Sequence, residues 1–408
     1  MAFFKKEVQK TNESVQKFGY DLFCQNMQNK NPVLSPISAY LTLVMAGCGA
    51  DGTTKTEFLE VLGNDMMTLA VDMINTFSVQ EESLKLSIAN SAWIDQSFTV
   101  NTTWSDTIKS LMGGDIFGVN LTSNETMDKI NRWIADRTNG LIDQMLTEPL
   151  GPKELIKLAL FNTIYFKGRW ENPFKPFNTQ KEAFYLLDES NHHWFKRHSV
   201  QTDMMCDRTA EVGYIANDFV EGVILPYQNN QKKDSGFLVF DCQNMGKRYC
   251  CKGFGFIALK SKGKDSIRDV CSKLNGHVMH ELLSHREVEL LDLKVPRFKS
   301  VFDVNLIESL TKMGLIECFD RNKANLSLMG RDTKTGITLY VSLVRQNVVL
   351  TVDEEGTEAA ATTELLGCLR AMEQPRKKMY FNEPFIYMVM DLERELPLFI
   401  GILDNPQM

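Results

Sequence analysis

The sequence predicts an α+β fold, because helix-like and strand-like segments follow one another without the regular alternation of a parallel βαβ protein. Apolar residues recur at helical spacing in 12–29 and 125–146, whereas 158–166 form a continuous apolar run typical of a buried central strand. The run Val348–Val352 is rich in β-branched residues and indicates another buried strand near the C-terminus.

The first part of the chain predicts two helices joined by a short strand. An apolar stripe marks the first helix, formed by Val15, Phe18, Leu22 and Phe23. Residues 31–38 indicate a strand stub and then a serine helix cap. The apolar segment through Met45 predicts a buried helix that ends at Gly47–Gly49.

The rest of the chain mixes strands with amphipathic helices. The helical pattern of 125–146 contains a natural stop at Asn139-Gly140. Asp303–Leu315 predicts an amphipathic helix closed by Gly314. Further strands are predicted at 86–94, 286–298 and 337–352.

Composition and charge describe an ordinary globular chain. Its 408 residues are 43% hydrophobic and 24% charged, which is ample for a large core. No linker, low-complexity block or repeat divides it, so we expect a single domain over 1–408 and a monomer. The net charge of −7 does not suggest affinity for nucleic acid or membranes. No apolar run approaches the ~20 residues that span a bilayer.

The cysteines and the N-terminal residues bear on the compartment. The N-terminus lacks the long apolar core of a secretory signal. Nine cysteines, an odd number, favour free thiols in a reducing cytoplasm. Five Asn-x-Ser/Thr sequons favour a glycosylated, extracellular protein instead. They begin at Asn12, Asn101, Asn120, Asn124 and Asn325. A removed leader or unconventional secretion would make the protein extracellular.

No constellation of residues predicts catalysis or metal binding. His277 and His280 would share a helix face, but zinc enzymes place two histidines four residues apart with a Glu beside the first. Cys250-Cys251 is a vicinal pair and not a Cys-x-x-Cys motif. No Gly-x-Ser-x-Gly elbow marks a serine nucleophile. We therefore expect no enzyme activity, metal or cofactor.

The segment Asp353–Thr363 is an unusual continuation of a buried strand. Beyond the acidic turn the side chains are small, and one parity carries no charge: Thr357, Ala359, Ala361 and Thr363. Because successive residues of a strand point to opposite faces, the segment suits a sheet with one small face and one wet face. An exposed Ala-rich helix start capped by Asp353 or Thr357 fits the composition equally well. The Thr-Thr pair and Gly367 count against the helix.

Several motifs occur in an order and spacing that together are specific. They are 31–38, 160–174, 295–298, 339–342, 353–361, 381–385 and 397–401. On these residues the chain resembles the serpins, serine-protease inhibitors with a mobile reactive-centre loop, from about residue 12 to Pro406. It resembles in particular their intracellular ovalbumin-like members. The resemblance implies three β-sheets with about nine helices and a reactive-centre loop at about 354–378.

The resemblance also implies a mechanism. A target protease attacks one peptide bond of the loop and forms an acyl-enzyme. The cleaved loop then enters the main sheet as a new strand and distorts the protease before deacylation. We expect the hinge to be solvated before cleavage and a strand afterwards. It comprises Glu354, Glu355, Gly356, Thr357, Glu358, Ala359, Ala360, Ala361 and Thr362. Its small inward side chains favour the inhibitory branch over a non-inhibitory carrier, chaperone or storage protein.

The scissile residue of this family lies sixteen positions after the first hinge Glu, which leads from Glu354 to Arg370, with Ala371 as the next residue. An Arg suits proteases whose specificity pocket carries an Asp, because the contact is bidentate and charge-assisted. The resemblance thus implies a covalent complex with a trypsin-like serine protease. A cysteine protease with basic specificity is an alternative target. Arg376, Lys377 and Lys378 are rival cleavage points. They rank second because cleavage there would lengthen the inserting strand.

The region where the main sheet opens is also implied by the resemblance. Its buried polar cluster maps to Ser35, Ser38, Asn162 and, where a His is usual, Gln346. Glutamine donates and accepts hydrogen bonds but does not titrate, which argues against pH-dependent opening there. Trp170 is expected beneath the top of the sheet.

Three further features depart from the family pattern or add to it. Residues from about 228 to 252 look like an insertion. The stretch 65–82, where heparin-binding members carry a basic helix, is nearly free of Lys and Arg, so we expect no heparin activation. Cys368 lies two residues before the scissile position, where oxidation would block docking.

Overall fold

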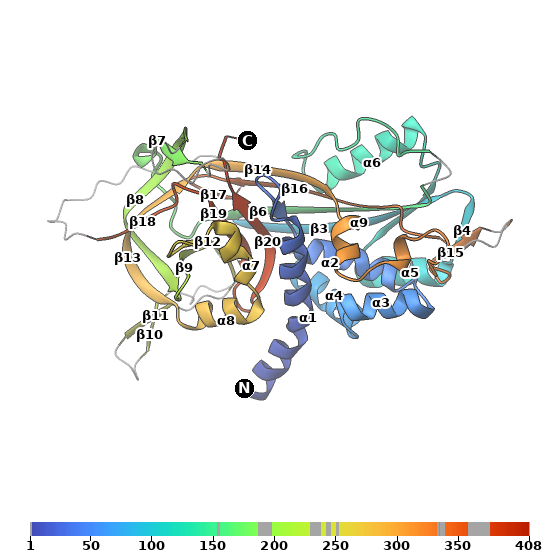
Figure 1. Ribbon diagram of the computed structural model, residues 1–408, viewed down its shortest axis with the longest axis horizontal. Helices are drawn as coiled ribbons and strands as arrows, with labels where there is room; N and C mark the ends of the chain where they lie inside the picture. The colour runs from blue at the N-terminus through green and yellow to red at the C-terminus, as the bar shows by residue number, and fades with distance from the viewer. Residues whose placement is uncertain are drawn as a thin grey trace.

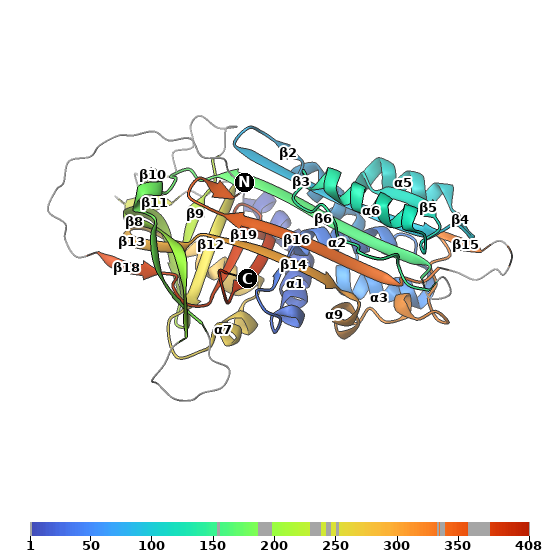
Figure 2. The same ribbon diagram turned by 90° about the horizontal axis from the view of Figure 1, so that it is seen from above.

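The fold is described from a computed structural model that covers residues 2–152, 156–186, 198–228, 238–241, 246–249, 253–332, 334, 339–357 and 376–407. Long strands run along the longest axis of the molecule. Curved strands gather at one end and most of the early helices at the other (Figures 1 and 2).

Nine α-helices occur in the described ranges: α1 (Ala2–Asn26), α2 (Pro36–Gly47), α3 (Gly52–Leu62), α4 (Met66–Thr76), α5 (Thr102–Met112), α6 (Asn124–Arg137), α7 (Ile267–Lys273), α8 (Gly276–Ser284) and α9 (Ile307–Lys312). Two 3₁₀ turns accompany them, η1 (Pro176–Asn178) and η2 (Glu317–Phe319). No helix of the described ranges is long and apolar enough to cross a membrane.

The strands of the described ranges are β1 (Val33–Leu34), β2 (Val79–Gln80), β3 (Leu84–Asp95), β4 (Phe98–Val100), β5 (Asp115–Val119), β6 (Leu158–Arg169), β7 (Gln180–Tyr185), β8 (Ser199–Ala216), β9 (Val220–Pro226), β10 (Leu238–Asp241), β11 (Gly246–Tyr249), β12 (Phe254–Ser261), β13 (Glu287–Pro296), β14 (Phe298–Asn305), β15 (Gly330–Asp332), β16 (Leu343–Val352), β17 (Gly356–Thr357), β18 (Lys377–Tyr380), β19 (Phe385–Asp391) and β20 (Leu396–Leu403).

Three large sheets result, two of which are continuous through the long strand β8. One end of β8 pairs with β7 and its other end pairs with β9, while β13 runs along the opposite edge. The β9 side continues through β12, β19, β20 and β1, and the β13 side ends at β18. The third sheet has the order β14-β16-β17-β6-β3-β2, with β5 also paired to β3. This α+β architecture confirms the predicted fold class.

The third sheet separates two cores. Residues of one parity, such as Ile94 and Leu160, face the larger core together with α2. Residues of the other parity, such as Trp93 and Phe161, face a smaller core beneath α6. The alternation follows from the two-residue period of a strand, so every side chain of β3 and β6 belongs to one side or the other.

The elements near the N-terminus agree with the sequence prediction. Ser35 caps α2, since its side chain accepts a hydrogen bond from the N–H of Ser38, and Pro36 occupies the first helical turn. All residues of α2 are buried, as its continuous apolar pattern predicted.

Two predicted boundaries were wrong, and the helical pattern of 125–146 is interrupted at the stop that was predicted within it. The helix at 125–146 ends at Arg137, because Asn139 and Gly140 adopt left-handed backbone angles, with φ of 53° and 76°. The helix expected at 303–315 is a strand through Asn305, and α9 begins only at Ile307. The strand expected from residue 337 begins at Leu343.

The stretch predicted as an insertion contains one described feature. β10 and β11 pair with each other and, in the described part, with no other strand. The remaining residues of 229–252 lie outside the described residues.

Candidate functional site

The predicted site residues fall into three groups in the structure. Glu354–Thr357 of the hinge are described and lie at the top of the third sheet. The rest of the hinge, Glu358–Thr362, lies outside the described residues, as do Arg370, Ala371 and Cys368. The predicted sheet-opening residues are all described.

The start of the hinge is already a strand. β17 pairs antiparallel with β16 through Val352 and Thr357, and with β6 through Gly356 opposite Arg169. This differs from the expectation of a hinge solvated before cleavage. Residues 356–357 are held by ladder pairs on both sides, and both are buried.

A tight turn at 353–356 connects β16 to β17. The Asp353 carboxylate accepts hydrogen bonds from the N–H groups of Glu355 and Gly356, at 2.9 and 3.1 Å. Gly356 has φ of 154°, and a Cβ on it would lie 2.0 Å from the carbonyl oxygen of Gly168. Only glycine therefore fits this position without moving β6.

Thr357 is the first inward-facing side chain of the hinge. Its side chain is fully buried, and its hydroxyl lies 2.7 Å from the hydroxyl of Tyr227. Tyr227 in turn stacks on Trp170, with ring centroids 4.7 Å apart. The position thus accepts a small hydroxyl residue and leaves no room for a long or charged one, as the parity argument predicted.

Glu354 fixes the turn by ionic contacts. Arg297 donates to both of its carboxylate oxygens, at 2.5 and 3.1 Å, and the Thr179 hydroxyl donates at 2.6 Å. The Glu354 carbonyl accepts from the N–H of Phe174 at 2.9 Å. We call this set, Glu354 with Arg297, Thr179 and Phe174, the upper latch.

The pKa values of the two turn carboxyls, Asp353 and Glu354, are shifted in opposite directions. Burial alone would raise the pKa of Glu354, but the bonds from Arg297 and Thr179 outweigh it and hold that pKa below its usual range. Burial raises the pKa of Asp353 despite the two backbone N–H groups it accepts from. Glu171, beside Trp170, has its pKa raised to about 7 by burial, and one of its oxygens has no partner among the described residues.

Trp170, expected beneath the top of the sheet, contacts the hinge. Its indole N–H donates to the carbonyl of Asp353 at 2.9 Å, and its backbone N–H donates to the carbonyl of Glu355 at 2.8 Å. Eight positions of extended chain separate it from Asn162, or roughly 26 Å. Among the residues predicted for the sheet-opening region, Trp170 therefore lies apart from the other four, at the hinge end of the sheet.

The other four predicted residues do meet beneath the middle of the sheet. Gln346 accepts from the N–H of Ser35 at 3.0 Å and donates to the Ser35 carbonyl and to Asn162, at 3.0 and 2.9 Å. Asn162 donates to the Ser38 carbonyl at 2.7 Å. The Ser38 hydroxyl itself has no partner among the described residues. We call Ser35, Ser38, Asn162 and Gln346, together with Thr42 and Asn90, the lower latch.

Thr42 and Asn90 complete the lower latch and were not predicted. Asn162 donates to both, at 3.0 and 2.6 Å, and Thr42 donates to Asn90 at 2.7 Å. Both are buried. Thr42 lies in the mainly apolar helix α2, and Asn90 shares one parity of β3 with apolar residues only: Leu84, Leu86, Ile88, Ala92 and Ile94. That isolated polarity is the signal in the sequence from which they could have been found.

An open seam lies between the two latches. β16 and β6 run parallel and pair from Leu343–Ala159 to Asn347–Thr163. Above this point no ladder pair joins 348–351 to 164–167 in the described part of the chain, until β17 fills the top. At the lower end of the seam the side-chain oxygens of Thr163 and Asn347 are buried without a described partner.

No cluster of the described residues forms a metal site of three or more His, Cys, Asp or Glu side chains. His280, whose spacing from His277 did not fit a zinc site, instead contacts the Glu395 carboxylate at 2.9 Å.

Comparisons with known proteins agree on one family. The profile of Serpin (serine protease inhibitor) matches residues 13–406. The chain is 27% identical over 409 residues to Serpin-Z10 of Arabidopsis thaliana, covering 98% of both chains. It is 28% identical to Antithrombin-III of Homo sapiens, covering 93% of this chain and 77% of the relative.

A solved structure gives the same answer for the fold. The native state of tengpin, a thermophilic serpin, superposes with a TM-score of 0.83 at 25% identity, covering 97% of this chain and 94% of that one. The chain therefore belongs to the serpin family of serine protease inhibitors, and it is not an enzyme.

Proposed function

We propose that the protein is an irreversible inhibitor of a trypsin-like serine protease, which traps the acyl-enzyme by inserting its cleaved loop into the seam between β16 and β6. The observation that carries this proposal is the seam itself, with β17 already paired at its top. An inserting strand gains ladder hydrogen bonds along both edges of the seam. These bonds offset the ~1–2 kcal/mol of backbone entropy lost for each residue ordered.

The side chains of the hinge support insertion. Thr357 already fills an inward position of the sheet. The next residues of the same parity are also small: Ala359, Ala361 and Thr363. The unpartnered oxygens of Thr163 and Asn347 are polar groups at the lower end of the seam that a new strand or its side chains would satisfy.

The geometry of β18 supports Arg370 as the scissile residue. The rival residues Lys377 and Lys378 lie in β18, paired parallel with Leu291 and Asp292 of β13. Cleavage there would require β18 to leave its sheet, whereas Arg370 precedes the strand by seven residues. A trypsin-like protease reads Arg through an acidic specificity pocket.

Incubation with trypsin tests the proposal. The wild-type protein should form a complex that survives SDS, and Arg370→Glu should lose it because the specificity pocket rejects the carboxylate. Thr357→Arg should still be cleaved at Arg370 but release free protease, because the guanidinium has no space beside Tyr227. If wild-type protein is only cleaved and trypsin turns over freely, a carrier or storage role replaces inhibition.

We also propose a reducing compartment, as in the intracellular ovalbumin-like serpins. Five cysteines in the described part are unbonded thiols: Cys24, Cys48, Cys206, Cys271 and Cys318. Alkylation of the protein from its native source, and then mass spectrometry, should find these thiols free and the five sequons unglycosylated. Glycosylated sequons would place the protein outside the cell.

A further inference from the structure

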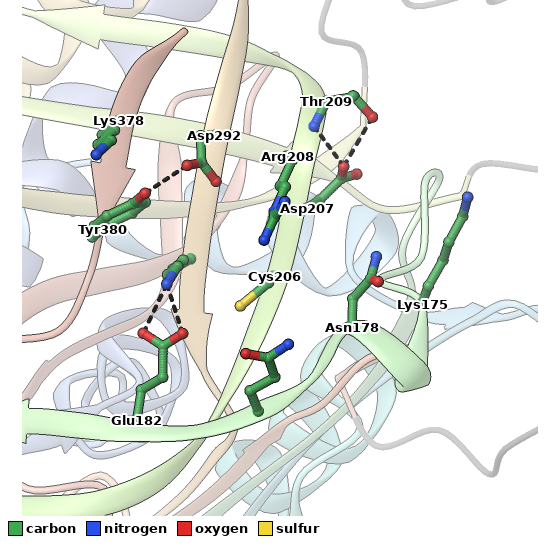
Figure 3. A pocket seen from close by; sticks show the side chains of 12 residues that line it. Lys175, Asn178, Glu182, Cys206, Asp207, Arg208, Thr209, Asp292, Lys378 and Tyr380 are labelled. Carbon is green, nitrogen blue, oxygen red and sulfur yellow. Dashed lines mark hydrogen bonds and ion pairs between the residues drawn. The ribbon is translucent and has the colours of Figure 1, made fainter. Parts of the chain in front are cut away.

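A hollow of about 580 Å³ lies on the sheet formed by β7, β8, β13 and β18, beside the turn η1 (Figure 3). Its lining is almost entirely polar, and the proposed mechanism uses none of it. β18 forms one wall, and this strand is the segment by which the reactive-centre loop rejoins the body of the molecule.

The side chains on the floor of the hollow are hydrogen-bonded to one another. Lys294 contacts both oxygens of Glu182, at 2.6 and 2.8 Å. The Tyr380 hydroxyl donates to Asp292 at 2.5 Å. These four side chains therefore satisfy one another's hydrogen bonds, and the Asp292 carboxylate leaves one net negative charge on the floor.

The rim is different, because it carries more cations than acids. Lys175, Arg208 and Lys378 are exposed and come from three elements: the loop before η1, β8 and β18 (Figure 3). No ion pair joins any of them to a carboxylate of the described residues. Two acids lie near them. Asp207 accepts from the backbone N–H and hydroxyl of Thr209, at 2.8 and 3.1 Å, and Asp292 is the strand partner of Lys378.

An exposed aromatic residue adjoins these cations. Phe177 is 71% exposed, the largest exposure of any large hydrophobic side chain in the described part of the chain. It lies in η1 between Lys175 and Asn178, which both line the hollow. Aromatic and basic side chains together are typical of the residues that dominate protein–protein binding energy.

The hollow lies close to the reactive-centre loop, which suggests a protease bound to that loop as the partner. Arg376 is the first described residue after the loop, six residues from Arg370, so at most about 22 Å of extended chain separates them. A protease domain of about 230 residues has a radius of gyration of about 17 Å. A protease bound at Arg370 is therefore large enough to overhang the rim of the hollow.

We propose that Lys175, Arg208, Lys378 and Phe177 form a second docking surface for the target protease, which receives an acidic patch next to its active site. This proposal rests on the proposed inhibitory function and adds that the preferred target is acidic on that face. Such charges act mainly on the rate of association, and their effect falls as salt screens it.

The test is the second-order association rate with two probes, a trypsin of acidic isoelectric point and one of basic isoelectric point. K175E/R208E should slow association with the acidic trypsin about tenfold at about 20 mM salt and less than about twofold at about 0.5 M salt. With the basic trypsin the same variant should be unchanged or faster.

A matched control removes the same charge elsewhere. Arg321 and Lys323 are exposed, without ion pairs in the described structure, in the turn between η2 and β15. β15 lies at the opposite end of the molecule from β18 in both views (Figures 1 and 2). R321E/K323E should alter the rate with the acidic trypsin less than about twofold.

Phe177→Ala tests the apolar part of the surface. With a trypsin whose nucleophilic serine is replaced by alanine, this variant should dissociate about five- to tenfold faster than wild type, with its salt dependence unchanged. Equal thermal midpoints would show that none of these exposed substitutions unfolds the protein.

Three outcomes overturn the docking surface. The first is an equal effect of the two charge-reversal pairs. The second is SDS-stable complexes that form at unchanged rates in every variant, which leaves the inhibitory function intact. The third is acceleration by heparin that K175E/R208E abolishes, which assigns the cations to a polysaccharide. Failure of the wild type to trap either trypsin overturns the inhibitory function itself.

Discussion

The two latches lie at opposite ends of the seam between β16 and β6 but are built from opposite kinds of chemistry. The upper latch is ionic and partly exposed, since the Arg297 side chain is 45% accessible while that of Glu354 is 6% accessible. The lower latch is neutral and buried, and Gln346, at its centre, has no exposed surface. The upper latch should therefore respond to pH and to contact from outside, whereas the lower latch should respond only when the strands themselves separate.

The largest effect on stability should come from breaking the lower latch. Asn162→Ala removes three donated bonds and the acceptor of Gln346, and it leaves several buried polar groups unpaired. We expect a loss of about 3 kcal/mol in the free energy of unfolding, measured by urea denaturation. Thr163→Val, one residue away, is the control, because its hydroxyl has no described partner and its loss should cost nothing. A small effect of Asn162→Ala would show that the cluster does not hold the sheet closed.

The upper latch should be weaker. Arg297→Ala leaves the Glu354 carboxylate buried without its main partner, and we expect a loss of about 2 kcal/mol at pH 7. Arg297→Ala combined with Glu354→Gln should recover part of this loss, because no buried charge then remains. Lys181→Ala, which breaks the exposed contact to Asp203, should cost less than about 0.5 kcal/mol. Equal costs for the two substitutions would contradict a structural role for the Glu354 ion pair.

The contrast in pH response can be tested at Gln346. Gln346→His places a titratable group where no charge can be solvated, so its pKa in the folded state should fall below that in the unfolded state. The unfolded state then binds more protons, and the variant should lose about 1–2 kcal/mol of stability as pH falls below about 6.5. Thermal midpoints from pH 8 to pH 5 should show this slope in the variant relative to wild type. Parallel curves would mean that the site is more open to water than its burial indicates.

The smallest effect should come from Glu171, beside the upper latch. Its folded-state pKa of about 7 lies above the usual value, so its ionisation opposes folding increasingly as pH rises from about 4.5 to 7. Glu171→Gln should stabilise the protein by about 1 kcal/mol at pH 8, after allowance for solvent screening, and hardly at all at pH 4.5. The Glu354 carboxyl acts in the opposite direction. Its lowered pKa adds stability above the usual carboxyl range, and that stability is lost as acid protonates it. A Glu171→Gln gain that is equal at both pH values would rule out ionisation as its cause.

The sequence predicted the parts of this arrangement that obey local rules. The serine cap of α2, the buried strand β6 and the stop at Asn139-Gly140 all depend on residues close in the chain. Ser35, Ser38, Asn162, Trp170 and Gln346 were reached through family resemblance, and the structure places each in contact with the main sheet or the hinge.

Residues far apart in the chain were missed for a physical reason. Arg297, Thr179 and Tyr227 contact the hinge across 57, 175 and 130 residues, and no local pattern reports such a contact. The helix expected from Asp303 failed because that segment pairs with β16 through Asn305, and strand pairing overrides local helical spacing. The seam could not be predicted from the sequence either, because it is a stretch where two strands, far apart in the chain, lack ladder hydrogen bonds to each other.

The seam has a consequence beyond the protein's own loop. It is an internal edge, and the backbone groups of an edge do not distinguish a strand of the same molecule from one supplied by a neighbour. A strand of the same molecule and a strand of a neighbouring molecule therefore compete for the seam. A higher protein concentration favours the neighbour's strand. Crowding many copies together, or loosening the latches by heat, should thus convert single molecules into linked chains at the expense of the proposed inhibitory activity.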